Sequence, residues 1–152
     1  MRLTLITPAR MKSEPCRELV VEYVKRANRY RPMAHEELSL PRQSTSPESA
    51  ALVQRMARAT PRHKLVILDE RGKLMDSRKF AETLERWRDD SVGEVLFAVG
   101  GPHGYSEELK KQAHMLWSLS PLTMPHELAA TVAAEQIYRA LTLMAGHPYH
   151  ND

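Results

Sequence analysis

The feature that most constrains the fold is a regular alternation of short apolar runs with longer amphipathic segments. Residues 2–7 (RLTLIT), 64–68 (KLVIL) and 94–99 (EVLFAV) are apolar runs of strand length, and helical patterns separate them. Continuous apolar runs are typical of strands that helices cover on both faces. The alternation therefore predicts an α/β fold with a mainly parallel sheet flanked by helices.

Serines before amphipathic segments mark the expected helix starts, because a serine side chain can accept a hydrogen bond from a free backbone N–H of the first turn. The expected N-caps are Ser13, Ser46, Ser77 and Ser106. Apolar residues from Leu19 to Tyr30 recur at helical spacing and should face the core. A long last helix is expected over residues 126–145. Residues 115–119 should form a fifth strand, and residues 33–40, interrupted by charges, an edge strand.

The length of 152 residues fits one compact domain spanning residues 1–152. The first apolar run is too short for a signal peptide or a membrane span, so we expect a cytoplasmic protein without a membrane partner. Cys16 is the single cysteine, which excludes an intramolecular disulfide and a thiolate metal site. The net charge of +3 permits a polyanionic partner but does not establish one.

Two loops at expected strand ends could bind a ligand. Gly100, Gly101 and Gly104 follow the strand at 94–99, where glycines let a ligand approach the backbone. Their spacing is neither the dinucleotide fingerprint nor a P-loop, and a plain turn is about as good an explanation. The second loop, residues 119–125, carries apolar side chains between two prolines. An adenine could lie among them, although simple packing before a helix would explain the same pattern.

Polar residues near the same edge and in the tail offer further chemistry. Asp69 and Glu70 follow the strand at 64–68 and could contact ribose hydroxyls or an ammonium group, while Asp76 could instead cap a helix. His147 and His150 lack a third ligand, so we expect no metal site. Stacking on a base or donation to a phosphate is the better functional interpretation of this tail. The alternative is that Tyr149 only docks the tail on its own domain or on a partner subunit.

Five segments, taken in order, resemble one known family. LDERGK, VGGPHGYS, WSLSPLTMPHEL, EQIYRAL and the terminal HPYH are similar to motifs of the ribosomal RNA large subunit methyltransferase H family, in the SPOUT superfamily. The resemblance spans essentially the whole chain and is dense from residue 65 onward. It implies a C-terminal trefoil knot, which ordinary connection rules would have excluded.

The resemblance also implies an activity and a set of site residues. Family members form homodimers, bind S-adenosylmethionine in the knot and methylate N3 of a pseudouridine in 23S rRNA of the assembled ribosome. Carried onto matching positions, the cofactor-binding residues are Leu68, Asp69, Gly100, Gly101, Leu119, Ser120, Pro121, Leu122, Thr123, Met124 and Pro125. The candidates for orienting the uridine or easing proton loss, grouped as catalytic, are His126, Arg139, Tyr149 and His150. None of them is identified as a base, and Arg139, like Tyr138, could equally belong to a dimer interface or to the core packing of the last helix.

The chain departs from the family pattern in two places, the glycine loop and the end of the tail. His103 stands where the family commonly has glutamate, and Asn151 and Asp152 follow HPYH where a basic residue is common. The missing basic tail residue leaves open a ribosome-associated RNA-binding module without catalysis. Without the resemblance, the residues also allow an α/β enzyme of nucleotide-binding type with a small-molecule substrate and an unknotted sheet.

Overall fold

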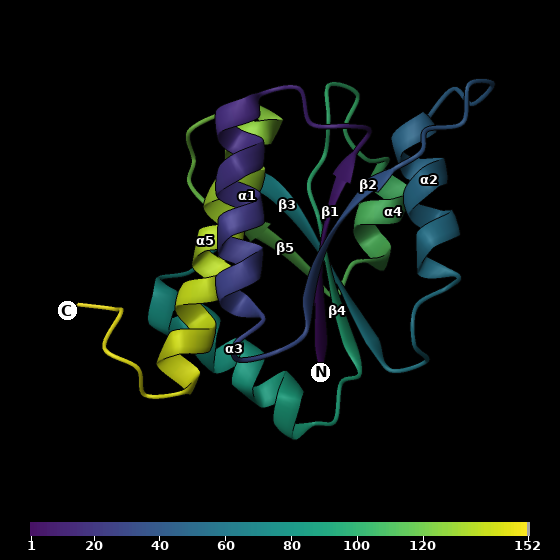
Figure 1. Cartoon of the computed structure of the whole chain (residues 1–152). Coiled ribbons are helices and arrows are strands. Elements are labelled where there is room, and N and C mark those ends of the chain that lie inside the picture. The colour runs from purple at the N-terminus through teal and green to yellow at the C-terminus, as the bar shows by residue number, and fades with distance from the viewer. Residues whose placement is uncertain (152) are drawn as a thin grey trace.

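The computed structural model describes residues 1–151 and consists of one five-stranded sheet with five helices (Figure 1). Asp152, one of the two residues of the unusual tail end, lies outside the described residues. The strands are β1 (Arg2–Pro8), β2 (Met33–Leu38), β3 (His63–Leu74), β4 (Glu94–Ala98) and β5 (Met115–Ser118). The helices are α1 (Glu14–Ala27), α2 (Pro47–Met56), α3 (Ser77–Asp89), α4 (Glu107–Gln112) and α5 (His126–Met144).

All neighbouring strands of the sheet run parallel, in the order β2-β1-β4-β3-β5. The predicted parallel α/β sheet is confirmed, and so is the edge position of β2. The order places β3 between β4 and β5. Because parallel strands share one direction, the loops that leave β3, β4 and β5 meet at the same edge of the sheet.

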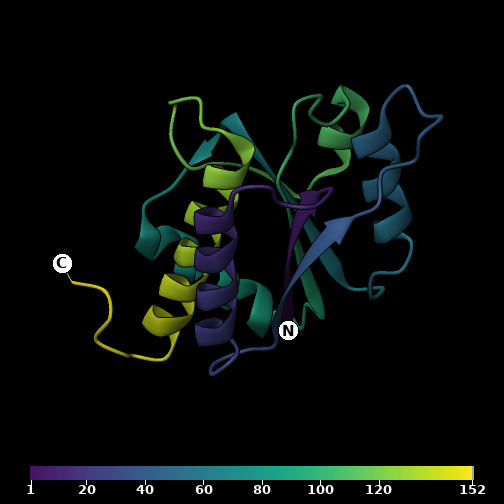
Figure 2. The same cartoon turned by 45° about the horizontal axis from the view of Figure 1, so that its top comes forward.

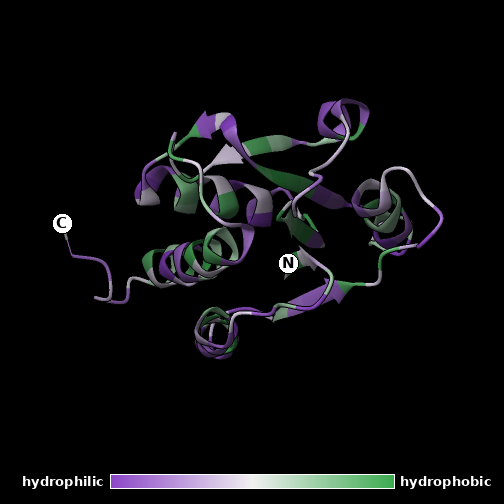
Figure 3. Cartoon of the chain, turned by 90° about the horizontal axis from the view of Figure 1, so that it is seen from above, coloured by the Kyte–Doolittle hydropathy of each residue, from purple (hydrophilic) through white to green (hydrophobic). Residues whose placement is uncertain are grey.

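Helices cover both faces of the sheet, as the continuous apolar runs predicted. Helices α1, α3 and α5 pack on one face, and α2 and α4 on the other (Figures 1 and 3). Val66 belongs to the first core, whereas Leu65 and Ile67 belong to the second, because successive side chains of a strand point to opposite faces. Among residues 1–151, no helix has the length and apolarity needed to cross a membrane.

The helix caps confirm three of the four expected starts. Ser13, Ser46 and Ser106 occupy N-cap positions, although Ser46 makes no side-chain cap hydrogen bond. The expectation for Ser77 was wrong: Asp76 caps α3 by accepting a hydrogen bond from the Lys79 N–H at 2.8 Å.

Two further details differ from the expected pattern. Leu19 was expected in the core but is 45% exposed, since α1 turns neighbouring Val20 toward the sheet instead. Strand β3 continues to Leu74, well past the apolar run that ends at Leu68. Its pairing with β5 is interrupted between Leu68 and Lys73, so residues 69–72 form an irregular excursion beside the end of β5.

The trefoil knot stays a prediction, because strand order alone does not test how the chain is threaded.

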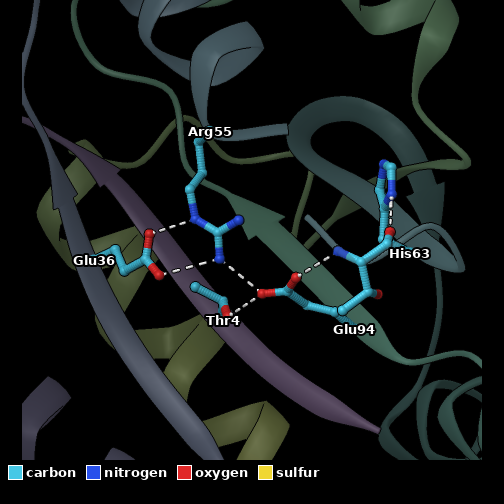
Figure 4. A network of polar contacts seen from close by, with 6 residues as sticks. Thr4, Glu36, Arg55, His63 and Glu94 are labelled. Atoms are coloured by element: carbon cyan, nitrogen blue, oxygen red, sulfur yellow. Dashed lines mark hydrogen bonds and ion pairs between the residues drawn. The ribbon is translucent and has the colours of Figure 1, made fainter. Parts of the chain in front are cut away.

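A buried ion-pair network ties α2 to the sheet at the end opposite the loops (Figure 4). The Arg55 guanidinium donates to Glu36 Oε2 at 2.6 Å and to Glu94 Oε1 at 2.7 Å. Thr4 Oγ1 and the Thr60 N–H also donate to the Glu94 carboxylate. Burial acts to raise the pKa of Glu94, but the hydrogen bonds and charge of Arg55 outweigh it, so the pKa lies below its usual value. Glu94 is thus a buried charge that depends on its partners.

Replacing Arg55 with methionine should destabilise the fold by about 3 kcal/mol, because it leaves the buried Glu94 carboxylate without its cation. Chemical denaturation would measure the loss. Arg88→Met is the matched control: its ion pairs on α3 are far more exposed, so removing them should cost less than about 1 kcal/mol. Equal effects of the two substitutions would contradict the role given to Arg55.

Candidate ligand site at the carboxyl edge of the sheet

The irregular excursion of β3 and the loops that follow β4 and β5 enclose a cavity of about 620 Å³. Its walls come from residues 68–71, from residues 99–105 and from most of residues 119–126, with Trp117 of β5, Lys110 of α4 and Ala129 of α5 beside them. Figure 2 shows these three loops at one end of the sheet. A volume in the range of about 300–1,000 Å³ is typical of small-molecule and cofactor sites. The cavity is therefore the candidate functional site.

Most of the residues predicted to bind the cofactor line this cavity. They are Leu68, Asp69, Gly100, Gly101, Leu119, Ser120, Leu122, Met124 and Pro125. Pro121 and Thr123 belong to the same loop but do not line the cavity. Thr123 instead supports the loop from outside. The fold places these nine residues around one cavity. Their contacts with the cofactor stay a prediction.

Hydrogen bonds to the β3 excursion hold the loop at 119–125 in place. Thr123 Oγ1 donates to Glu70 Oε2 at 2.8 Å, and Ser118 Oγ donates to the Glu70 carbonyl oxygen at 3.0 Å. Within the loop, the Leu122 N–H donates to Ser120 Oγ at 3.0 Å. The Leu122 side chain is 74% exposed at the cavity. An apolar side chain held at a cavity with so little cover is suited to packing against a ligand.

An ion pair between Lys110 and Asp69 keeps the Asp69 carboxylate ionised in the wall of the cavity. Lys110 Nζ lies 2.8 Å from Asp69 Oδ2, and the Arg71 N–H donates to Asp69 Oδ1 at 2.9 Å. Burial acts to raise the pKa of Asp69, but the hydrogen bonds from Lys110 and Arg71 outweigh it and lower the pKa. Asp69 is therefore ionised at neutral pH and held in one orientation. Lys110 and Arg71 were not among the predicted site residues: Lys110 is distant from Asp69 in sequence, and Arg71 contributes its backbone N–H, which the type of side chain does not reveal.

The glycine loop is supported from below by the first turn of α2. The carboxylate of Glu48 accepts hydrogen bonds from the N–H groups of Gly101, at 3.0 Å, and His103, at 3.3 Å. The Gly104 N–H donates to the Gly101 carbonyl oxygen, and Gly104 adopts a φ of 65°, a conformation that favours glycine. Sequence reasoning missed Glu48, because an acidic residue in a first helical turn is ordinarily explained by the helix dipole.

The four catalytic candidates fall into two groups. His126 lines the cavity at the first residue of α5. Arg139, Tyr149 and His150 gather instead around Glu135: Arg139 and Tyr149 both donate to Glu135 Oε1, and Arg139 Nη1 lies 3.1 Å from His150 Nδ1. A helix rises about 1.5 Å per residue, so Arg139 is about 20 Å along α5 from His126. Figure 2 shows the two ends of α5 far apart.

No group of three or more histidine, cysteine, aspartate or glutamate side chains within residues 1–151 is placed to hold a metal ion. A parallel α/β sheet with a cavity at its carboxyl edge, walled by glycine and proline loops, defines a ligand-binding protein of the kind that carries nucleotide-like cofactors.

Comparison with known proteins narrows this class. The family described as "Predicted SPOUT methyltransferase" matches residues 1–150. Proteins named "Ribosomal RNA large subunit methyltransferase H" are 41% identical over 150 residues in Deinococcus deserti and 37% identical over 160 residues in Brucella anthropi, covering 99% of this chain and of each relative. The chain belongs to the SPOUT methyltransferases and, within them, to the ribosomal RNA large subunit methyltransferase H family.

Solved structures with low sequence identity share the fold. A probable methyltransferase from Bordetella pertussis Tohama I is similar with a TM-score of 0.55 at 18% identity, over 92% of this chain and 94% of that one. The SpoU methyltransferase AviRb from Streptomyces viridochromogenes, determined in complex with AdoMet, gives a TM-score of 0.50 at 16% identity, over 96% of this chain and 59% of that one. Both similarities support the SPOUT fold.

The Asp69–Lys110 ion pair should stabilise the protein in a pH-dependent way. In Lys110→Met, we expect a loss of about 1 to 2 kcal/mol in the free energy of unfolding at neutral pH, because a charged hydrogen bond inside the cavity wall is removed. Since the folded pKa of Asp69 lies below its ordinary value of 3.8, the stabilisation is present above that pH and disappears as the pH falls through the folded pKa.

Urea denaturation at neutral pH and at several pH values below 3.8 would measure this difference. Lys111→Met, at the exposed neighbouring lysine, is the control and should show little effect at any pH. A difference between wild type and Lys110→Met that stays constant over the whole pH range would rule out the ion pair as its source.

Proposed function

We propose that this chain is an S-adenosylmethionine-dependent methyltransferase that modifies N3 of a pseudouridine in 23S rRNA. The observation that carries the proposal is the cavity between the loops at 100–104 and 119–125, which lies within the residues that the family model matches. The names of the full-length relatives support ribosomal RNA as the substrate, and the AdoMet complex of AviRb supports the cofactor. The proposal includes an assembled ribosome as partner, a cytoplasmic location and one catalytic domain spanning residues 1–152.

The residues of the cavity fit S-adenosylmethionine chemically. Leu119, Leu122 and Met124 offer an apolar surface for the adenine ring. Asp69 and Glu70 offer carboxylate oxygens for ribose hydroxyls or for the ammonium group of the methionine part. The glycine loop offers backbone at Gly100 and Gly104, which carry no side chain of their own. Apolar, acidic and backbone surfaces thus match the three parts of the cofactor.

Catalysis by this chain would depend mainly on positioning. Bound S-adenosylmethionine supplies a methyl group on a sulfonium, which is reactive enough to be transferred without a metal. The side chains have to hold N3 of the base in line with that methyl group and let the N3 proton leave. His126 is the candidate closest to this task, since it lines the cavity. Arg139, Tyr149 and His150 can donate to a phosphate or stack on a base.

A homodimer would reunite the two groups of catalytic candidates. In one chain, the cluster of Arg139, Tyr149 and His150 lies about 20 Å along α5 from the cavity residue His126. The segment after α5 extends away from the sheet (Figure 2). We propose that this cluster approaches the cavity of a partner subunit, so that each RNA site contains residues from two chains.

Binding of S-adenosylmethionine should be measurable by calorimetric titration with a Kd in the micromolar range, about −8 kcal/mol. Ribosomes from a strain lacking the modification should accept labelled methyl groups on 23S rRNA, at N3 of one pseudouridine. Absence of saturation at millimolar cofactor would refute the proposed cofactor. Cofactor binding and ribosome binding without methyl transfer would instead indicate a non-catalytic RNA-binding module.

The shared site can be tested by mixing two inactive variants. Gly101→Ala should weaken cofactor binding, because its Cβ would lie 2.5 Å from Glu48 Oε1 and 2.8 Å from Pro8 Cγ. His150→Ala should leave cofactor affinity unchanged but impair methyl transfer. If each RNA site uses two chains, the mixed dimers contain one intact site and activity reappears after subunit exchange. Mixtures that remain as inactive as the separate variants, despite verified exchange, would contradict a shared site.

A further inference from the structure

Glu48 is an unusual residue in the part of the chain beneath the cavity. It lies in the first turn of α2 and is only 1% exposed. Its two carboxylate oxygens accept hydrogen bonds from two backbone N–H groups of the glycine loop. Glu48 is not among the residues that line the cavity. A buried carboxylate is costly unless hydrogen bonds compensate it. Its location therefore indicates that Glu48 orients the glycine loop and does not contact the ligand directly.

The hydrogen bonds of Glu48 determine which way two peptide groups of the loop face. The N–H of Gly101 shares a peptide plane with the carbonyl of Gly100, and the N–H of His103 shares one with the carbonyl of Pro102. In a trans peptide the N–H and C=O bonds point in opposite directions, and no cis peptide occurs in the described chain of residues 1–151. With both N–H groups directed at Glu48, both carbonyls point away from it. Gly100 and Pro102 both line the cavity.

The neighbouring contacts make this arrangement rigid. Ser49, next to Glu48, accepts a hydrogen bond from the Ser106 N–H at 2.9 Å, so the same turn of α2 holds both ends of the loop. Tyr105 is buried and donates to the Val99 carbonyl oxygen at 2.9 Å. Gly101 is needed because any Cβ would collide with the Glu48 carboxylate. Helices α2 and α4 lie side by side on this face (Figures 1 and 2).

We infer that Glu48 is a positioning residue for the cofactor: it orients the Gly100 and Pro102 carbonyls as fixed acceptors for N–H donors of the ligand. S-adenosylmethionine carries two such donors, the amino group of its adenine and its ammonium group. Preorganised acceptors bind more tightly because the loop does not have to be ordered when the ligand arrives. The inference rests on the proposed function, since it assumes that this cofactor occupies the cavity.

Glu48→Gln provides the test. The amide keeps the size of the side chain, but its NH₂ group faces an N–H that needs an acceptor, so one peptide group of the loop loses its orientation. The Kd for S-adenosylmethionine, measured by calorimetry on folded protein, should rise about tenfold. The KM for the cofactor should rise in parallel, while kcat at saturating cofactor changes by less than about twofold.

The matched control is Glu94→Gln, which weakens a buried ion pair at the opposite end of β4. This variant should lose at least as much thermal stability as Glu48→Gln, yet its Kd for S-adenosylmethionine should equal that of wild type. A merely structural role for Glu48 would give the same pattern as the control. An unchanged Kd in folded Glu48→Gln would overturn the inference.

Two further measurements keep the test decisive. If Glu48→Gln does not fold, Glu48→Asp retains the charge but cannot reach both N–H groups, and a Kd at least about threefold above wild type is expected. An unchanged Kd in this variant would also overturn the inference. Wild-type protein that fails to bind S-adenosylmethionine refutes the proposed cofactor itself, which is a different outcome from equal binding by wild type and variant.

Discussion

The rest of the structure depends on the parallel pairing of β3 with both β4 and β5. Register pairs such as Val66 with Phe97, and Leu68 with Trp117, align the three strands so that they end at one edge. The loops after them, far apart in sequence, therefore meet there and enclose the cavity. Leu65, Val66 and Ile67 of β3 are fully buried between the helices of the two faces, which secures this alignment. A change of register would separate the glycine loop from the loop at 119–125.

Polar contacts hold in place the three cavity segments that the sheet brings together. Glu70 holds the loop at 119–125, Lys110 holds Asp69, and Glu48 holds the glycine loop. Each contact joins segments that are distant in sequence, so each forms only once the sheet is assembled. Because these contacts hold the three segments within the protein itself, the cavity has its shape before any ligand arrives. Such preorganisation suits an enzyme whose chemistry consists mainly of alignment.

The sequence predicted the elements that have strong local signals. Apolar runs such as residues 64–68 identified the buried strands, and serine caps identified most helix starts. Capping by Asp76 could not be separated from capping by Ser77, since both types accept such hydrogen bonds. The extension of β3 to Leu74 was missed because its charged residues show no strand pattern. The exposure of Leu19 was missed because periodicity alone does not fix the exact rotation of a helix.

In the candidate site, too, the sequence predicted some features and missed others. Glycines, prolines and family motifs pointed to the loops that line the cavity, and the resemblance supplied the cofactor, the homodimer and the knot. Glu48 and Lys110 carry no motif of their own, because their partners are distant in sequence and only the folded sheet brings them together. The separation of His126 from the cluster around Glu135 likewise follows from the length of α5, and it is the observation that motivates the proposed homodimer.

The most direct test of the account is a crystal structure of the protein with S-adenosylhomocysteine, the product left after methyl transfer. We predict that the ligand occupies the cavity between residues 100–104 and 119–125, with its adenine among the apolar side chains of the second loop. A ligand bound elsewhere on the chain, with this cavity filled only by solvent, would contradict the central claim.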